Sequence, residues 1–221
     1  MVILQIEATY GLGSTGNIAL DLRKRIEQEG WTCYVAYPIV RKDLQNDAYG
    51  YKIGNWFDHK LHALLSRVYG KQAYYSTLPT LRLIRFIKRI KPDVIQYHDL
   101  HSNYINLNLL LKFIAKTNIR LVITLHDGWF FTGGCFHYTN AHCDRWHSAC
   151  GHCPKKLQDT PAYLGDRSAQ ILKDRYKYFG QIKDLKVVGV SQWIADECQK
   201  SFFRGRDVCV IHNGVDMEVF K

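Results

Sequence analysis

VILQIEATYGLGSTG, residues 2–16, places a short apolar run directly before a glycine-rich turn. A run that is apolar rather than alternating is typical of a parallel strand buried on both faces. The turn Gly11–Gly16 has the spacing G-x-G-x-x-G. It stands where a doubly wound sheet opens its first helix and exposes N–H groups to an anion. The stretch therefore predicts a β–α unit whose loop contacts phosphate, or alternatively a tight β–α turn without a ligand.

The same alternation of apolar runs and helical patterns continues along the chain. The predicted strands are Val2–Ile6, Thr32–Tyr37, Asp93–Tyr97, Leu121–Leu125, Lys186–Val190 and Val208–Ile211. The predicted helices are Gly16–Glu29, Trp56–Tyr69, Pro79–Ile90, Asn103–Lys116, Asp166–Phe179 and Ser191–Phe203. Strands separated by helical crossovers predict an α/β fold, a Rossmann-like doubly wound parallel sheet.

The glycine spacing also matches the dinucleotide fingerprint, which raises the alternative of an NAD-dependent oxidoreductase. That fingerprint needs an acidic residue at the end of the second strand to bind a ribose. Thr32–Tyr37 is followed by Pro38 and has no acid there. The sequence therefore favours contact with a diphosphate over binding of NAD.

The charge balance points to an anionic partner. The chain has 30 Lys and Arg against 20 Asp and Glu, a net charge of +10. Basic residues alternate with apolar ones in the segment Arg82–Lys91, which makes an amphipathic basic helix. Two interpretations follow: a solvated helix face over a core, or contact with an anionic membrane surface. The sequence contains no apolar run of about 20 residues and no signal peptide, so we expect a cytoplasmic protein.

Four of the seven cysteines lie in the insertion 128–163, which follows neither the helical nor the strand periodicity. Cys135, Cys143, Cys150 and Cys153 are spaced C-x7-C-x6-C-x2-C. The closing C-x2-C lets two thiolates bind one tetrahedral ion, so we expect a structural zinc ion that orders this loop. Three alternatives stay open: a histidine replacing one cysteine, two disulfides, or free thiols. The candidate histidines are His137, His142, His147 and His152.

Five segments, taken in order, carry a resemblance to a known family. They are Leu4–Ile6 with Gly11–Gly16, Lys91–His101, Thr124–Asp127, Val190–Trp193 and Ile211–Asp216. Together they resemble the N-terminal half of the retaining family 4 glycosyltransferases, which have the two-domain GT-B fold. The cysteine-rich insertion resembles the subgroup found in bacterial capsule and exopolysaccharide clusters.

This resemblance implies transfer of a sugar from a nucleotide diphosphate sugar to a lipid-linked saccharide, with retention and without a required catalytic metal. It implies that Gly13, Ser14, Thr15 and Gly16 face the donor diphosphate. It places His126 near the transferred sugar, with Asp127 beside it as an orienting or binding group. His98, Asp99 and His101 follow another strand end and are candidates for the acceptor side, or for structural roles.

The resemblance also predicts the domain organisation. We expect residues 1–211 to form the acceptor-side domain and residues 212–221 to begin a linker to a C-terminal donor domain that this sequence does not contain. The expected location is the inner face of the cell membrane, as a peripheral protein. A competing interpretation of the charge and the cysteines is a zinc-stabilised nucleic-acid-binding module. The basic residues are dispersed along the sequence, so we expect no nucleic-acid partner.

Overall fold

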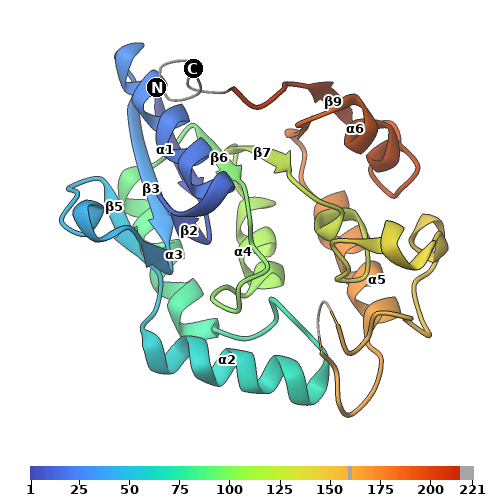
Figure 1. Ribbon diagram of the computed structural model, residues 1–221. Coiled ribbons are helices and arrows are strands. Elements are labelled where there is room, and N and C mark those ends of the chain that lie inside the picture. Colours follow the sequence, from blue (N-terminus) through green and yellow to red (C-terminus); the bar gives the residue numbers. More distant parts are fainter. Residues whose placement is uncertain (159–160, 215–221) are drawn as a thin grey trace, which may run out of the picture.

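The computed structural model describes residues 1–158 and 161–214, and it has one large parallel sheet (Figure 1). Among the described residues the sheet has seven strands in the order β5-β3-β1-β6-β7-β8-β9. These are β1 (Val2–Ile6), β3 (Thr32–Tyr37), β5 (Gly50–Lys52), β6 (Val94–Tyr97), β7 (Arg120–Leu125), β8 (Leu185–Gly189) and β9 (Asp207–Val210). Two short strands, β2 (Thr9–Tyr10) and β4 (Ile39–Val40), pair with each other. The predicted doubly wound parallel sheet is confirmed.

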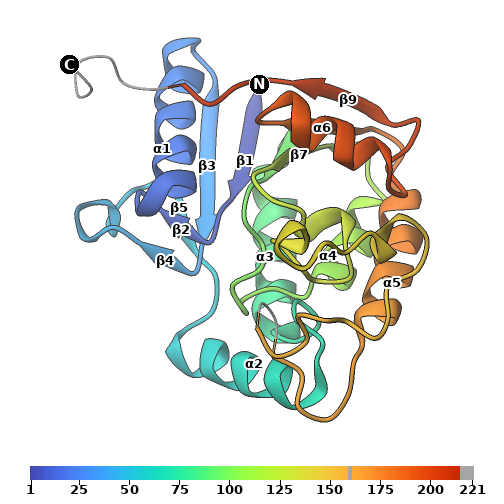
Figure 2. The same cartoon turned by 45° about the vertical axis from the view of Figure 1, so that its right-hand side comes forward.

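Helices lie on both sides of this sheet. They are α1 (Gly13–Gln28), α2 (Trp56–Tyr69), α3 (Thr77–Ile90), α4 (Leu107–Ile114), α5 (Ser168–Gly180) and α6 (Gln192–Gln199). Figure 2 shows α1 on one side of β1 and β3, with α3 and α4 on the other. Among the described helices, none combines the length and the apolar character that a membrane span requires.

The central strands are buried on both faces, which explains why their sequences are apolar without alternation. In β1, Ile3 belongs to a core that contains Ile26 of α1. Its neighbours Leu4 and Ile6 belong to the larger core on the other face, together with Leu83 of α3. β1 therefore contributes to two cores at once.

The strand order reverses between β1 and β6. The chain builds β1, β3 and β5 outward in one direction and then returns to place β6 on the other side of β1. Ligands of open α/β sheets bind outside the carboxyl ends of the strands at such a switch point. The topology thus predicts a ligand site among the residues that follow β1 and β6.

The basic segment Arg82–Lys91 covers the second half of α3 and ends at its C-cap Lys91, and its apolar residues pack against the core. Leu83, Ile84, Phe86 and Ile87 are buried, while the basic residues of the segment are exposed. The interpretation as a solvated basic face over a core is confirmed. The apolar side chains of the segment thus pack into the core, with Ile90 partly exposed.

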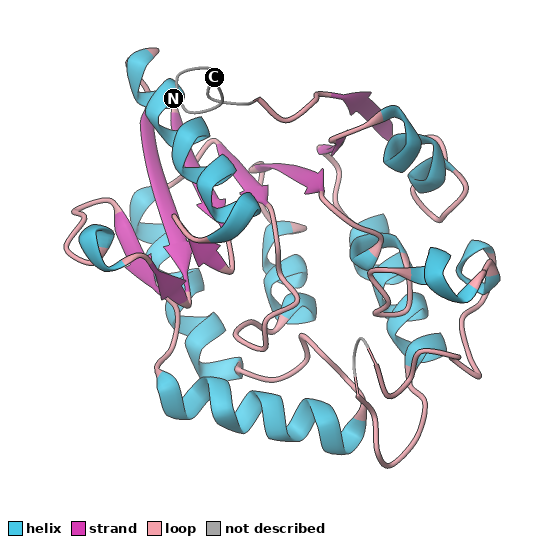
Figure 3. Cartoon of the chain, viewed as in Figure 1, coloured by secondary structure: helices cyan, strands magenta, loops and turns pink. Residues whose placement is uncertain are grey.

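The predicted insertion between β7 and α5 contains no long helix or strand among its described residues (Figure 3). It has three short 3-10 helices, η2 (Trp129–Phe131), η3 (Tyr138–Ala141) and η4 (Arg145–His147). The sequence suggests a loop with little means of its own to stay ordered, and here the structure differs. Trp129, Phe131, Tyr138 and Trp146 are all buried, so aromatic packing anchors the loop.

Candidate active site at the carboxyl ends of the strands

The glycine loop forms the first part of the site. Helix α1 begins at Gly13, whose φ of +66° is a left-handed conformation that glycine adopts without strain. Gly13 and Ser14 are exposed and Thr15 is half-buried, so these three residues can meet a ligand. Gly16 is different, because a Cβ there would lie 1.8 Å from the carbonyl oxygen of Thr9. Close packing therefore requires glycine at position 16, and the contact of Gly16 with a diphosphate stays a prediction.

Glu7 connects the glycine loop to the loop after β6. Its side chain is fully buried directly after β1. Oε1 accepts hydrogen bonds from the Thr9 N–H at 3.1 Å and from Thr15 Oγ1 at 3.3 Å, while Oε2 accepts from the Asp99 N–H at 3.2 Å. Burial, and next the charge of Asp99, raise the pKa of Glu7 to about 7. The carboxyl group therefore titrates near neutral pH at the switch point.

His98 and His126 form a second polar connection, between β6 and β7. His98 Nε2 lies 2.9 Å from Gln5 Oε1, and His98 Nδ1 lies 3.3 Å from His126 Nε2. The Gln5 amide nitrogen donates to the Ala19 carbonyl at 3.1 Å, so its oxygen is the acceptor toward His98. Burial, and then the neighbouring His126, lower the pKa of His98 to about 3, which keeps the ring neutral.

These contacts fix the tautomers of both rings. A neutral His98 that donates from Nε2 has an acceptor at Nδ1, and His126 must then donate from its own Nε2. Burial also lowers the pKa of His126. In the neutral ring of His126, Nδ1 is therefore left as a hydrogen-bond acceptor.

The burial of His98 corrects its predicted role. Its side chain is 1% exposed, so it cannot touch an acceptor substrate. His98 instead positions His126 through the contact between His98 Nδ1 and His126 Nε2.

His101 joins the two acidic residues of the site. Its Nε2 lies 3.5 Å from Asp99 Oδ1 and 3.4 Å from Asp127 Oδ2. Burial alone would lower the pKa of His101, but hydrogen bonds to Asp127 and Asp99, and their charges, raise it to about 10. The imidazole is therefore protonated at neutral pH and holds the two carboxylates together. Within the described parts of the chain, these three residues are the group whose potential metal ligands lie within 4.8 Å of one another.

Hydrogen bonds to neighbouring residues hold Asp127 and its loop in place. Its Oδ1 accepts from the Trp129 N–H at 2.7 Å, and Trp129 Nε1 donates to Gln72 at 2.9 Å. The buried guanidinium of Arg175 lies over the Trp129 ring at 3.8 Å and donates to the carbonyls of Trp129 and Thr132. The loop that carries Asp127 is thus tied to α5 and to the segment between α2 and α3.

The structure brings together five of the residues that sequence analysis singles out: His98, Asp99, His101, His126 and Asp127. The cysteines are placed elsewhere, around a separate cavity in the insertion. Sequence analysis did not find Glu7, Gln5, Gln72 and Arg175. Glu7 could have been noticed as the acid that directly follows a buried strand at the ligand-binding end of the sheet, but the other three stand in no recognisable pattern.

The chain is similar in sequence to known glycosyltransferases. The sequence matches the family described as Glycosyltransferase Family 4 over residues 15–219. It is 28% identical over 230 residues to WcaC of Escherichia coli strain K12, described as a colanic acid biosynthesis glycosyl transferase. That alignment covers 98% of this chain but 55% of WcaC, so the chain spans about half the length of this relative.

Two solved structures are similar over nearly the whole chain. One is an alpha-glucosyltransferase in complex with UDP and a 13-mer DNA, with a TM-score of 0.49, 10% identity, and coverage of 99% of this chain and 42% of that one. The other is the catalytic domain of starch synthase IV from Arabidopsis thaliana bound to ADP and acarbose, with a TM-score of 0.47, 12% identity, and coverage of 100% of this chain and 52% of that one.

Proposed function

This chain belongs to glycosyltransferase family 4, and on that premise we propose that it forms the acceptor-side half of a retaining enzyme. The enzyme would transfer a sugar from a nucleotide diphosphate sugar to a lipid-linked saccharide in bacterial surface polysaccharide biosynthesis. The observation that carries this proposal is the hydrogen bonding of Glu7, which ties the glycine loop to the loop of Asp99 at the switch point. The name of the relative WcaC supports the polysaccharide context.

The two parts of the site have different tasks in this proposal. The exposed N–H groups at the start of α1, with Gly13, Ser14 and Thr15, bind the donor diphosphate, because a helix N-terminus favours negative charge. His126 accepts a hydrogen bond from a sugar hydroxyl through Nδ1 and so orients the transferred sugar. In this proposal the transfer needs no catalytic metal.

Asp99, His101 and Asp127 form the acceptor side. Each is partly exposed, with side-chain exposures of 17%, 26% and 17%. The protonated His101 holds both carboxylates at a fixed separation, and each carboxylate keeps lone pairs that can accept from acceptor hydroxyls. Family membership favours this interpretation over a nucleic-acid-binding module or an NAD-dependent oxidoreductase.

The predicted domain organisation stays part of the proposal. Residues 1–211 would form the acceptor-side domain. Most of the predicted linker, 212–221, lies outside the described residues. The proposed partner domain would bind the nucleotide.

Contact with an anionic membrane is proposed through α2 instead of α3. Trp56, Phe57, Leu61 and Leu64 are 72%, 65%, 44% and 58% exposed and lie at helical spacing. Exposed apolar side chains with interspersed Lys60 and Arg67 are typical of helices that lie in a membrane interface. The exposed Tyr163 and Leu164 extend this surface, because their N–H groups bond to the Arg67 and Val68 carbonyls at 2.8 and 3.0 Å. On this basis we propose that the protein lies on the inner face of the cell membrane.

Transfer of a sugar by the full-length protein tests the proposed function. The protein would be incubated with a panel of nucleotide diphosphate sugars and a polyprenyl-diphosphate-linked saccharide, with the products identified by mass spectrometry. Extension of the acceptor by one sugar with retained configuration supports the proposal. A protein that binds no nucleotide sugar and extends no acceptor in the panel would refute it.

A further inference from the structure

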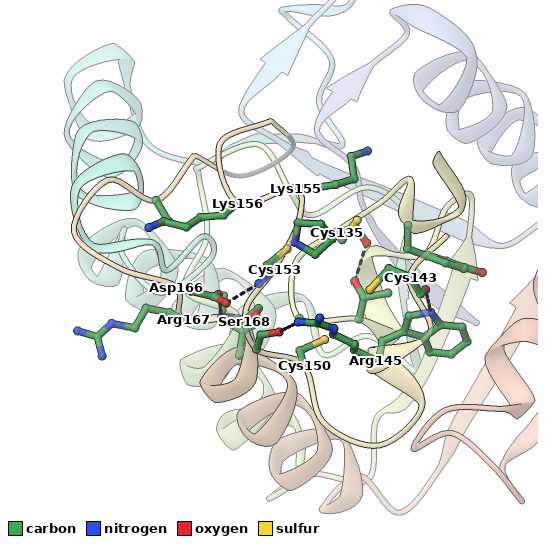
Figure 4. Close-up of a pocket in the computed structure, with 18 of the residues that line it drawn as sticks. Cys135, Cys143, Arg145, Cys150, Cys153, Lys155, Lys156, Asp166, Arg167 and Ser168 are labelled. Carbon is green, nitrogen blue, oxygen red and sulfur yellow. Dashed lines mark hydrogen bonds between the residues drawn. The ribbon is translucent and has the colours of Figure 1, made fainter. Parts of the chain in front are cut away.

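The four cysteines of the insertion line one cavity. Cys135, Cys143, Cys150 and Cys153 come from three separate turns, yet all border the same space next to α5. Figure 4 shows the four labelled side chains turned toward one another around this space. Within the described residues, the lining of the cavity includes no histidine.

The backbone around the first two cysteines is held by side chains of the insertion itself. Thr132 Oγ1 donates to the Cys135 carbonyl at 2.5 Å and accepts from the Gly134 N–H at 3.3 Å. Trp146 Nε1 donates to the Cys143 carbonyl at 3.1 Å. These bonds fix the backbone at Cys135 and Cys143, two residues that line the cavity.

The turn Cys150–Cys153 is held from two sides. Arg145 Nη1 donates to the carbonyls of Gly151 and His152 at 2.9 and 2.8 Å. Asp166 Oδ2 accepts from the Cys153 N–H at 2.7 Å. Gly151 and His152 have φ values of +134° and +49°, which close the turn tightly. A short turn that brings two cysteines to the same side is the arrangement by which C-x2-C segments hold a metal.

The residue beside Cys150 leaves room for its sulfur atom. A Cβ on Gly133 would lie 2.9 Å from Cys150 Sγ and 2.4 Å from the Ser168 carbonyl oxygen. The absence of a side chain at this position therefore lets Cys150 face the cavity at the end of α5.

We propose that these four cysteines bind one zinc ion with a structural role. Four thiolates satisfy the tetrahedral preference of zinc and leave no open position for catalysis. Neither Cys143 nor Cys150 is in a disulfide, which argues against the alternative of two disulfides. The absence of histidine from the described lining argues against a mixed ligand set.

Zinc binding requires a small rearrangement of the thiols. In this structure no three of them have sulfur atoms within 4.8 Å of one another, since the described group that meets this limit is Asp99, His101 and Asp127. A zinc ion holds each sulfur at about 2.3 Å, so binding would draw the thiolates closer together. The three turns that carry the cysteines already border one cavity, so zinc binding needs the sulfur atoms to approach one another within it.

Metal analysis of the full-length protein, purified without chelator, tests the site independently of any sugar transfer. We expect about one zinc per chain, as for a folded structural site. Cys143→Ser and Cys150→Ser should each lose the metal and lower Tm. Cys209→Ser is the matched control, because Cys209 is exposed on β9 outside the cavity and its loss should change neither.

Cobalt substitution keeps the test decisive if the serine variants fail to fold. Co²⁺ bound by four thiolates gives the wild-type protein an intense thiolate-to-metal charge-transfer absorption. Less than one tenth of a zinc per chain, together with no such absorption after addition of Co²⁺, would overturn the proposal. Zinc that persists in the Cys150→Ser variant would overturn the four-thiolate ligand set.

Discussion

His98 Nδ1 lies 3.3 Å from His126 Nε2, and the buried Gln5 amide on the far side of His98 dictates which of the two rings donates. Through these contacts, buried residues of the sheet determine the tautomer of the partly exposed His126. Gln5 Oε1 accepts a hydrogen bond from His98 Nε2, and His98 Nδ1 accepts one from His126 Nε2, so Nδ1 of His126 remains an acceptor. A residue inside β1 therefore controls the protonation pattern of a residue after β7.

Replacement of His126 by alanine should reduce kcat by about 10²-fold, because one positioned polar group at a reacting centre contributes on this order. The fold should be retained, since the ring is only partly buried. Nucleotide release by the full-length enzyme measures the effect. His212→Ala, which removes an exposed histidine, serves as the control. An unchanged kcat in His126→Ala would show that the assigned role is wrong.

Glu7→Gln should change how stability depends on pH. The folded pKa of about 7 lies above the ordinary value of 4.5, so the folded protein binds more protons than the unfolded one between these values. The contribution of Glu7 to the free energy of unfolding therefore falls as pH rises through this window, by up to about 3 kcal/mol. Glutamine does not titrate and lacks this loss.

The measurement is Tm of wild type and Glu7→Gln at several pH values between 4.5 and 8. The Tm of the variant should rise relative to that of the wild type as pH increases to about 7 and then stay level. Glu29→Gln, at an exposed position, should run parallel to the wild type. A constant difference between Glu7→Gln and wild type would mean that Glu7 does not titrate in this range.

Two glycines of the loop should respond differently to alanine. Gly13→Ala places a side chain in open space and costs only the left-handed backbone, roughly 1 kcal/mol. Gly16→Ala must displace the Thr9 carbonyl and should lower Tm much more. Thermal unfolding of both variants measures the packing contribution of each glycine. The KM for the donor, measured for Gly13→Ala, which should stay folded, measures the contribution of ligand contact. Equal losses of Tm would contradict the assignment.

Arg175→Met should destabilise the protein by about 3 kcal/mol, because it leaves buried carbonyl groups without their charged donor. The same change removes the cation over the Trp129 ring. Lys173→Met, an exposed position on α5, is the matched control and should have little effect. Chemical denaturation gives both values. A loss below about 0.5 kcal/mol, the size typical of surface substitutions, would show that the anchor is dispensable.

Membrane attachment should depend on α2. The double variant Trp56→Ser and Phe57→Ser removes two of its most exposed apolar side chains and should reduce flotation with vesicles that contain anionic lipid. Trp31→Ser, which removes an exposed tryptophan before β3, should float like the wild type. Equal recovery of the double variant, or equal flotation with neutral vesicles, would refute this contact.

Most of the fold can be predicted from local sequence patterns, the apolar runs of the strands and the periodicity of the helices. The strands Val2–Ile6 and Thr32–Tyr37 and the helix Trp56–Tyr69 have the predicted bounds. The prediction for α4 began too early, at Asn103. The helix begins at Leu107 because the Asn106 side chain accepts from the Leu109 N–H at 3.0 Å and caps it. The edge strand β5 was missed, since three residues give too short a pattern.

The candidate site was predicted where residues follow strand ends, because the carboxyl ends of parallel strands meet at one edge of the sheet. His126 and Asp127 were found in this way, as was Asp99. The partners of these residues were not, because their roles arise from contacts across long sequence separations. Gln72 reaches the indole of Trp129 across 57 residues, and no local pattern marks such a pair.

The burial of Trp129 has a spectroscopic consequence. The chain has five tryptophans. Trp129 and Trp146 are buried, whereas Trp31, Trp56 and Trp193 are 41%, 72% and 53% exposed. A water-soluble quencher should therefore suppress the emission of the exposed three and leave a blue-shifted signal from the buried pair. One of that pair contacts Asp127 and the other contacts Cys143, so the residual fluorescence would report on substrate binding at one end of the insertion and on metal occupancy at the other.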